Sequence, residues 1–475
     1  MKLIKNMTLS TFYQLMGVLV PLVTAPYVSR VLGSSGLGIN AFTASILSYF
    51  ALFAALGIQA YGNREIAYHQ NDVKARSKIF WELVILQAAA SLIAILAFFI
   101  FLAFQRQYQV YFLLQALTLV SAMVNISWFF MGLENFEIIV FRYTILNLII
   151  VILTFVLVRR PGDLWIYILL MMGSFLLANL SVWPFLKREL VRVSIKELEL
   201  RPHIGPAVAL LVPQIATTAY MNINKSMLGW MDSSSSVAYF TQADMIVRTA
   251  FTAVSSFAAA FLPRLSNLFS EGKIEEGKKL ILQSLQLMYV MSFLAIAGII
   301  GVSSNFAVFF FGKGFEAVGN LMAIEASVIL FFGIAVVLRS QYLMAVRRTK
   351  EITIASILAL LINIIFNFPL IPLLGALGAT ITVMFTEAMV TFYLLWTVRQ
   401  NFRYRDLFHQ IWKYLIAAGL AYLVVVSINQ HSSATLISFV IQALSGTAVY
   451  VLVLYLIKAP IVSLIASIIQ SRKKA

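Results

Sequence analysis

Residues 79–104 read IFWELVILQAAASLIAILAFFIFLAF, an almost continuous run of apolar side chains. A helix of about 20 residues is long enough to cross the ~30 Å hydrocarbon core of a bilayer, so this segment predicts a transmembrane helix. Comparable apolar segments recur along all 475 residues of the chain. The sequence therefore predicts an all-α, polytopic membrane protein.

The composition agrees with this fold class. Apolar residues make up 61% of the chain and charged residues 11%, whereas soluble domains average about half and about a quarter. These values exclude a soluble globular protein and a disordered chain. The chain contains no cysteine, which excludes disulfides, thiol nucleophiles and cysteine-bound metals.

We predict about fourteen transmembrane helices from the apolar segments. An even number places both termini on the same side of the membrane. The fifth and thirteenth segments are short for a bilayer span. The predicted segments are approximately 9–31, 37–58, 79–104, 110–131, 143–158, 164–186, 204–230, 240–262, 284–304, 321–343, 353–374, 376–397, 413–428 and 434–457.

The positive charges lie mostly on one side of this topology. The termini and the even-numbered connections carry 27 Lys and Arg residues, and the opposite side carries 4. The positive-inside rule then places both termini in the cytoplasm. The excess of 35 Lys and Arg over 19 Asp and Glu is thus explained by topology and lipid contact, and nucleic acid is not expected as a partner.

A short pattern recurs six spans apart and suggests two related halves, although a chance match in so apolar a chain stays open. Two halves of the same orientation would be related by an axis along the membrane normal, which is a transporter architecture. The two copies are Leu19-Val20-Pro21, Arg30, Leu32-Gly33 and Phe42, then Leu211-Val212-Pro213, Lys225, Leu228-Gly229 and Phe240. We therefore predict a six-helix bundle over 1–186, a cytoplasmic amphipathic linker over 187–203, a second six-helix bundle over 204–397, and two further helices with a basic cytoplasmic tail over 398–475. The composition of the linker is typical of an interfacial helix.

Charged residues within spans are rare and suggest functional sites. Cations within spans suit an anionic substrate, because an anionic group such as a diphosphate needs cationic partners in a medium of low dielectric constant. The in-span cations that are candidates to bind such a headgroup are Arg30, Lys225, Arg248 and Arg339. Each also has a structural interpretation, because cations near the ends of spans anchor to lipid headgroups. Arg248 follows Asp244 by four residues on one helix face, which predicts a neutral pair.

Glu387 is predicted near the middle of the twelfth span, far from both membrane surfaces. It must be protonated, paired with a cation or exposed to water. A coupling role and a fixed pair between helices are therefore both open for Glu387, and Asp244 is a candidate for the same two roles. Asn224 in the seventh span, and Asn363 and Asn367 in the eleventh, are candidates for a polar cavity or for interhelical hydrogen bonds.

The sequence lacks signals for catalysis. The four histidines lie in connections or at the edges of spans and form no HExxH spacing, and no GxxxxGK[ST] phosphate loop is present. We therefore predict that the protein is not an enzyme and uses no metal or cofactor.

Several motifs are spread over most of the chain. They are 26–33 (PYVSRVLG) followed by Gly36-Leu37-Gly38 and Phe42, 61–67 (YGNREIA), 262–266 (LPRLS), Asn363 and Asn367 before Leu370-Ile371-Pro372, 375–379 (GALGA) and Glu387. In this order they resemble the polysaccharide-unit flippases of the multidrug/oligosaccharidyl-lipid/polysaccharide exporter superfamily. Arg30 matches the first-helix arginine of that family. Asn224 stands before Lys225 where many relatives have an acid.

The resemblance implies two facing six-helix bundles with extra helices after the twelfth. It also implies flipping of undecaprenyl-diphosphate-linked oligosaccharide repeat units to the outer leaflet of a bacterial cell membrane by alternating access. The implied partners are the lipid-linked oligosaccharide, membrane lipids and polysaccharide polymerase machinery. A teichoic acid precursor flippase and a cation-coupled multidrug exporter of the same fold are alternatives, and the in-span cations count against the second. A membrane polymerase or glycosyltransferase would need a large loop or a cluster of acids, which the sequence lacks.

Overall fold

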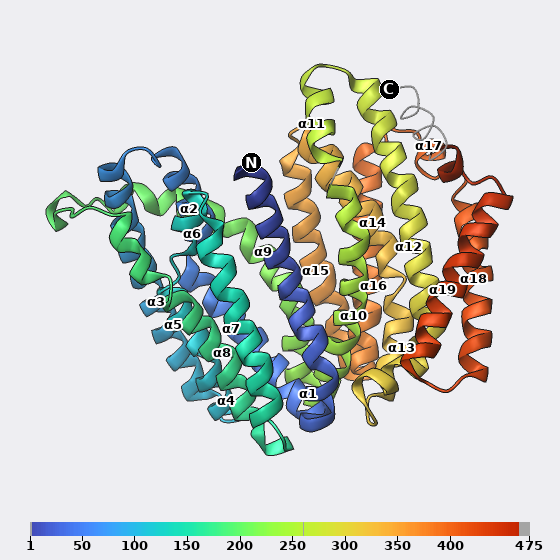
Figure 1. The fold of residues 1–475 in the computed structure, drawn as a ribbon, viewed down its shortest axis with the longest axis horizontal. Helices are drawn as coiled ribbons and strands as arrows, with labels where there is room; N and C mark the ends of the chain where they lie inside the picture. The colour runs from blue at the N-terminus through green and yellow to red at the C-terminus, as the bar shows by residue number, and fades with distance from the viewer. Residues whose placement is uncertain (1, 260, 465–475) are drawn as a thin grey trace. The chain divides into compact units, whose positions relative to one another are not determined.

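The computed structural model describes residues 2–259 and 261–464 (Figure 1). The described chain is 86% helical and contains no strand, which confirms the all-α prediction. It divides into two compact units, Met1–Ala238 and Tyr239–Ala475. The basic residues predicted for the tail, 472–474, lie outside the described part.

The first unit holds the amino-terminal helices and the long helix α9. Short 3-10 helices, η1 to η3, connect α7 to α8 and α8 to α9. The elements are α1 (Lys2–Ala55), α2 (Ile58–Tyr68), α3 (Val73–Phe104), α4 (Gln109–Gln115), α5 (Leu117–Met123), α6 (Ser127–Gly132), α7 (Phe136–Leu157), η1 (Pro161–Asp163), α8 (Leu164–Leu180), η2 (Trp183–Arg188), η3 (Ile195–Glu197) and α9 (Arg201–Met231).

The second unit begins within α10. Its element η4 is a π-helix that continues α14. The elements are α10 (Ser234–Ala259), α11 (Leu262–Ser270), α12 (Ile274–Phe311), α13 (Glu316–Glu325), α14 (Val328–Val336), η4 (Val337–Leu343), α15 (Thr349–Leu374), α16 (Ala376–Val398), α17 (Tyr404–Leu407), α18 (Ile411–His431) and α19 (Leu436–Leu456).

Eleven helices in the described residues are long and apolar enough to cross a membrane, or up to twelve if the bent pair Glu316–Glu325 and Val328–Leu343 is one span. The chain is therefore a polytopic membrane protein, and the number fourteen stays a prediction. Helix α1 covers the first two predicted spans, which a kink at Gly33 (φ 68°, ψ 179°) separates. Helix α10 corresponds to the eighth predicted span and is more polar, because Asp244 and Arg248 lie within it.

The two spans predicted to be short are longer helices in the structure. Helix α7 begins at Phe136, before Arg142, and α18 extends from Ile411 to His431. Arg142 is accommodated inside α7 because its guanidinium lies 3.6 Å from the centroid of the Phe185 ring and donates to the backbone oxygen of Ser181. A cation at this position therefore does not end the span.

The linker over 187–203 does not form the predicted interfacial helix. It contains the end of η2 and the short η3, and is otherwise irregular until α9 begins. Side chains of α3 bind its backbone: Arg76 donates to the carbonyl oxygen of Glu189 (2.8 Å), and Ser77 Oγ accepts from the Val191 N–H (3.0 Å). These tertiary hydrogen bonds replace the ones that a helix would form. Its position between two bundles stays a prediction.

The fourth predicted span, 110–131, is interrupted between α5 and α6. Two side chains from other helices bind the carbonyl groups that this break leaves without helical partners. Gln87 Nε2 donates to the backbone oxygen of Asn125 (2.9 Å), and Trp183 Nε1 donates to that of Val124 (2.8 Å). Since an unsatisfied backbone group is costly within a membrane, these bonds are what allow the break to persist.

Amide side chains attach the last two helices of the second unit to α12. Asn305 Nδ2 donates to the backbone and side-chain oxygens of Asn429, both at 3.0 Å, and Asn429 Nδ2 donates to the Gly301 oxygen at 3.1 Å. Gln442 of α19 donates to the same Asn429 side chain at 3.4 Å. Helices α18 and α19 are therefore integral to this unit.

Candidate functional site

Arg30 lies one turn before the kink of α1. Its side chain is exposed, and Nη1 donates to the backbone oxygen of Pro26 at 2.8 Å. Tyr27 holds the same turn against the end of α7, because its hydroxyl donates to the carbonyl oxygen of Val158 at 2.8 Å. The first-span arginine is thus placed on a fixed turn with its charged group accessible.

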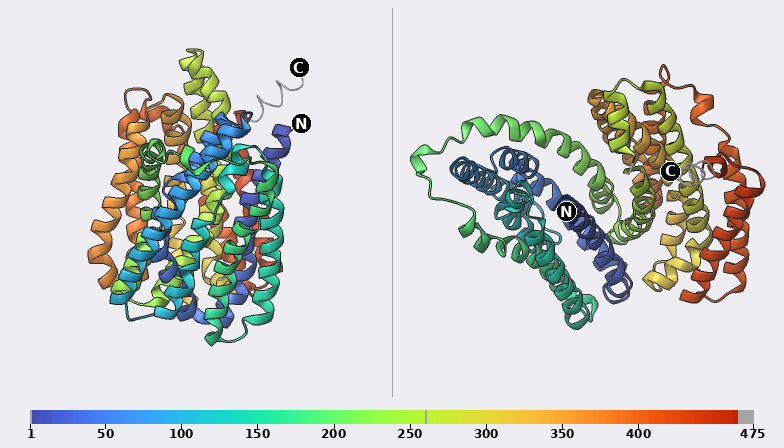
Figure 2. Two further views of the ribbon diagram at one scale, coloured as in Figure 1. Left: turned by 90° about the vertical axis from the view of Figure 1, so that its left-hand side faces the viewer. Right: turned by 45° about the horizontal axis from the view of Figure 1, so that its top comes forward.

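Lys225 lies in α9, a helix that curves along its length (Figure 2) and contains three prolines. Lys225 is half-buried between the buried residues Asn224 and Ser226. Ser226 Oγ is 2.9 Å from Ser45 Oγ of α1 and 3.3 Å from the Tyr49 hydroxyl. These contacts fix the rotation of α9 against α1 and so fix the position of the Lys225 side chain.

The two copies of the predicted repeat pattern meet within the first unit. Phe42 of the first copy packs on Gly229 of the second, where an added Cβ would be 2.0 Å from a ring atom. Gly38 approaches the backbone of Ser234, where an added Cβ would be 1.6 Å from the carbonyl oxygen. Gly229 of the pattern, together with Gly38 outside it, therefore allows the close contact of α1 with the α9–α10 junction.

In the second unit, Arg248 pairs with Asp244 as the four-residue spacing predicts. The guanidinium Nε lies 2.5 Å from Asp244 Oδ1, and its central carbon lies 5.5 Å from the centroid of the Phe332 ring. Part of the Arg248 charge is therefore neutralised within its own helix.

Arg339 lies in the π-helix η4 and is half-buried. Its Nε is buried and makes no hydrogen bond to any described residue. π-Helical turns occur often at functional sites, and a guanidinium donor in a span requires an acceptor or water. Arg339 therefore keeps a donor that an anionic group could use.

Glu387 and the two asparagines lie in the hairpin of α15 and α16. Asn363 and Asn367 are fully buried, and Asn367 Nδ2 donates to Asn363 Oδ1 at 2.8 Å. Glu387 is 3% exposed. Asn363 lies twelve residues before the turn at Gly375 and Glu387 twelve after it, so at ~1.5 Å per residue they lie at about the same depth. The hairpin therefore buries Asn363 and Glu387 at a similar depth.

One cluster in the first unit was not found from the sequence. His203 Nδ1 is 2.8 Å from the Tyr61 hydroxyl, and its Nε2 is 2.9 Å from Glu82 Oε2. The other carboxylate oxygen of Glu82 accepts from the Glu199 N–H at 2.7 Å and lies 3.7 Å from Lys78 Nζ. The sequence signal that could have revealed this cluster is Glu82, an acid in the first turn of the predicted span 79–104. The cluster joins α2 and α3 to the start of α9.

The structure brings the predicted site residues together only in part. Arg30 and Lys225 lie in the first unit, on helices that pack against each other. Asn224 also lies in the first unit, and the remaining predicted residues lie in the second, where two pairs form, Asp244 with Arg248 and Asn363 with Asn367. Among the described residues, no group of three or more His, Cys, Asp or Glu side chains could hold a metal ion.

Known proteins similar to this chain are transporters. It is 24% identical over 399 residues to a "Putative O-antigen transporter" of Shigella dysenteriae, covering 83% of this chain and 100% of the relative. It is 25% identical over 395 residues to a protein of the same description from Escherichia coli (strain K12), covering 81% of this chain and 93% of the relative. Neither relative is described as an enzyme, in agreement with the prediction that this protein is not one.

A solved structure and a family model also match this chain. A structure of the lipid II flippase MurJ in an inward closed conformation aligns with a TM-score of 0.73 and 18% identity, over 97% of this chain and 100% of the other. The family model described as "Polysaccharide biosynthesis protein" matches residues 3–269, which is more than half of the chain. The chain therefore belongs to this polysaccharide biosynthesis family, and the resemblance to polysaccharide-unit flippases is confirmed.

Proposed function

We propose that this protein flips a lipid-linked oligosaccharide precursor of a surface polysaccharide across a bacterial cell membrane. The observation that carries the proposal is the alignment with an O-antigen transporter over that relative's whole length. The substrate would be an undecaprenyl-diphosphate-linked repeat unit, moved from the cytoplasmic to the outer leaflet by alternating access. Both termini would be cytoplasmic, and polymerase machinery would act on the flipped unit.

The in-span cations suit the diphosphate of such a substrate. Arg30 is accessible on a fixed turn, and Arg339 has a buried Nε donor that no described residue accepts from. Guanidinium groups form paired hydrogen bonds to phosphate, which are stronger than neutral hydrogen bonds. Lys225 adds a second cation in the first unit. Arg248 is the weakest candidate of the four because Asp244 already neutralises it.

The lipid-linked sugar pool tests the proposal directly. In a strain depleted of this protein, completed undecaprenyl-diphosphate units should accumulate on the cytoplasmic leaflet, where periplasmic glycosidases do not reach them. Their sugars would also distinguish a capsule or O-antigen unit from a teichoic acid precursor. Units found on the outer leaflet but unpolymerised would contradict flipping and indicate a polymerase.

The variant Arg30→Ala is expected to lower the flipping rate by at least tenfold. A charged hydrogen bond contributes about 1.5–3 kcal/mol, which corresponds to roughly 10- to 150-fold in binding. Arg30→Lys keeps the charge and should recover part of the rate. The measurement is transport of the lipid-linked unit into vesicles, normalised to protein in the membrane. Arg106 is an exposed cation on the same predicted side, and Arg106→Ala is the control. Equal flipping rates for the two alanine variants would indicate that Arg30 only anchors the helix to lipid headgroups.

The variant Glu387→Gln is expected to slow flipping severalfold while the protein remains folded. Glutamine keeps the shape and one acceptor oxygen of the buried side chain but removes its ability to exchange a proton or a charge. The neighbouring Thr386→Val is a matched control, because the Thr386 hydroxyl is buried and makes no hydrogen bond to a described residue. An unchanged rate in Glu387→Gln would favour a packing role.

A further inference from the structure

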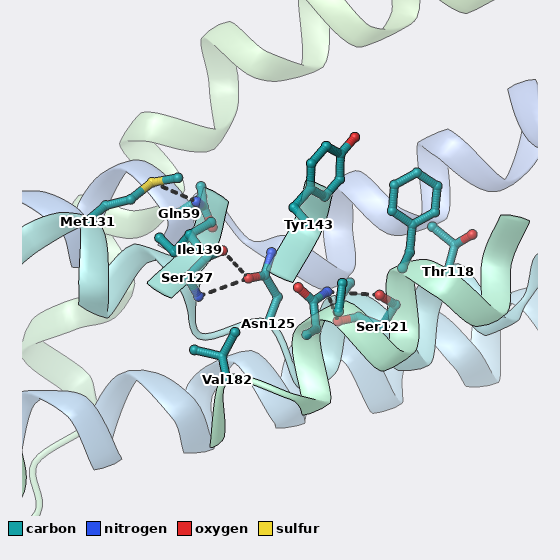
Figure 3. Close-up of a pocket in the computed structure, with 13 residues that line it drawn as sticks. Gln59, Thr118, Ser121, Asn125, Ser127, Met131, Ile139, Tyr143 and Val182 are labelled. Carbon is teal, nitrogen blue, oxygen red and sulfur yellow. Dashed lines mark hydrogen bonds between the residues drawn. The ribbon is translucent and has the colours of Figure 1, made fainter. Parts of the chain in front are cut away.

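The first unit contains a cavity of about 360 Å³, lined by both polar and apolar side chains, on the path of the broken fourth span (Figure 3). Residues of α2, α5, α6, α7 and α8 line it, so it lies entirely within Met1–Ala238. Small-molecule sites have volumes of roughly 300–1,000 Å³. We call this cavity the amide pocket after its three amide side chains, Gln59, Asn125 and Asn179.

The break between α5 and α6 builds the pocket. Asn125 stands in the break, and its Oδ1 accepts hydrogen bonds from the N–H (3.0 Å) and the hydroxyl of Ser127, which starts α6. Gln87 and Trp183 hold the break from the side, as described above. Four side chains thus maintain a non-helical turn, and the Asn125 side chain is fixed in place by it.

The amide groups keep unused hydrogen-bonding capacity. Asn179 Nδ2 donates to the backbone oxygen (3.0 Å) and hydroxyl (2.9 Å) of Ser121 (Figure 3). Gln59 Nε2 contacts only the Met131 sulfur at 3.6 Å. Within the described part of the chain, the Asn125 Nδ2 donor and the Oδ1 and Oε1 acceptors of Asn179 and Gln59 have no hydrogen-bond partner. The pocket therefore offers both donors and acceptors.

The lining carries no charged side chain. A phosphate would leave its charge without a counterion in a membrane segment, which is costly. Hydroxyl groups both donate and accept, and they match amides without a charge. Tyr143 also lines this space, and an aromatic ring suits the apolar C–H side of a sugar ring.

We propose that the amide pocket binds an uncharged, hydroxylated sugar of the lipid-linked substrate, separately from the cations that suit its phosphates. The inference rests on the proposed flippase function and assigns the sugar portion to the first unit. It places recognition of the sugar on Asn125 and Asn179, which their paired bonds to Ser127 and Ser121 orient, and on Gln59.

The absence of native cysteine allows a direct test. Ala178→Cys places one thiol in the lining of the pocket. The full-length variant in lipid nanodiscs is treated with a water-soluble maleimide under three conditions. The first has no added lipid, the second has undecaprenyl diphosphate, and the third has undecaprenyl diphosphate that carries an uncharged oligosaccharide. We expect the sugar-bearing lipid to slow labelling at least fivefold and the bare lipid diphosphate to have no effect. Ser270→Cys, at the exposed end of α11, should label equally in all three conditions.

Each other result would overturn the inference. Equal protection by both lipids would indicate a site for lipid or phosphate, and absence of protection would show that the sugar does not occupy the pocket. Binding of both lipids to the same nanodiscs, measured by native mass spectrometry, separates these results from a failure of the flippase proposal, in which neither lipid binds.

A second pair of variants checks the assignment by exclusion. Ala178→Phe should fill the pocket and weaken binding of the sugar-bearing lipid by about tenfold, with little effect on the bare lipid. Leu177→Phe enlarges the adjacent side chain, which is exposed, and should change neither affinity. Equal affinities in the two variants would contradict a sugar site here.

Discussion

Replacing Gly38 with alanine is expected to destabilise the first unit by about 3 kcal/mol or more, the upper range for an overpacked contact. The new Cβ would lie 1.6 Å from the backbone oxygen of Ser234. The obstacle is backbone, so no side-chain rotation relieves it and α1 must move away from the α9–α10 junction. The measurement is the thermal unfolding midpoint of the purified protein in detergent, together with its yield in the membrane.

Gly173→Ala in α8 is the matched control, because an added Cβ there has nothing within 4 Å. Alanine at an unstrained helical position is favoured over glycine by roughly 0.5–1 kcal/mol. The control should therefore unfold at the same temperature as the parent protein or slightly above it. A Gly38→Ala protein as stable as Gly173→Ala would show that the close approach of α1 to Ser234 is not required.

Replacing Glu82 with alanine is expected to cost about 3–5 kcal/mol and to release the start of α9. Glu82 is 2% exposed and binds three groups, the His203 ring, the Glu199 N–H and the Lys78 amine. Removal of the carboxylate leaves the buried His203 ring and the Glu199 N–H without their acceptor. Faster hydrogen exchange over residues 195–205 in the variant would report this release.

Two further variants make this result specific. Glu82→Gln keeps an acceptor for the Glu199 N–H and should recover part of the protection. Glu197→Ala removes an exposed acid that pairs with Lys74 at 3.7 Å, and an exposed pair contributes only about 0–1 kcal/mol. If Glu82→Ala exchanged no faster than Glu197→Ala, the cluster would not anchor α9.

Features determined by neighbouring residues were predicted from the sequence. Apolar segments of bilayer length identified the helices, and the spacing of Asp244 and Arg248 predicted a pair that forms. The family motifs, spread along the chain from Pro26 to Glu387, together also identified the family. Whether these residues bind substrate stays a prediction, because it depends on how the substrate enters.

Features determined by distant side chains were missed. The fourth span is apolar on both sides of its break, and the break depends on Gln87 and Trp183 from α3 and η2. His203 likewise lies at the edge of a span and has no local signature, because its partners come from α2 and α3. Single-span patterns do not contain these contacts, so neither the amide pocket nor the His203 cluster could be derived from them.

The hydrogen bonds of side-chain amides that join α18 to α12 also have a consequence for the synthesis of the chain. Asn429 follows Asn305 by 124 residues, so ribosomes complete α12 long before its partner exists. During that interval the Asn305 amide would face lipid, water or an assembly factor, and an amide in hydrocarbon is unfavourable. Late synthesis of α18 therefore completes the second unit, and premature termination before residue 429 would leave α12 with a polar group to be recognised by membrane quality control.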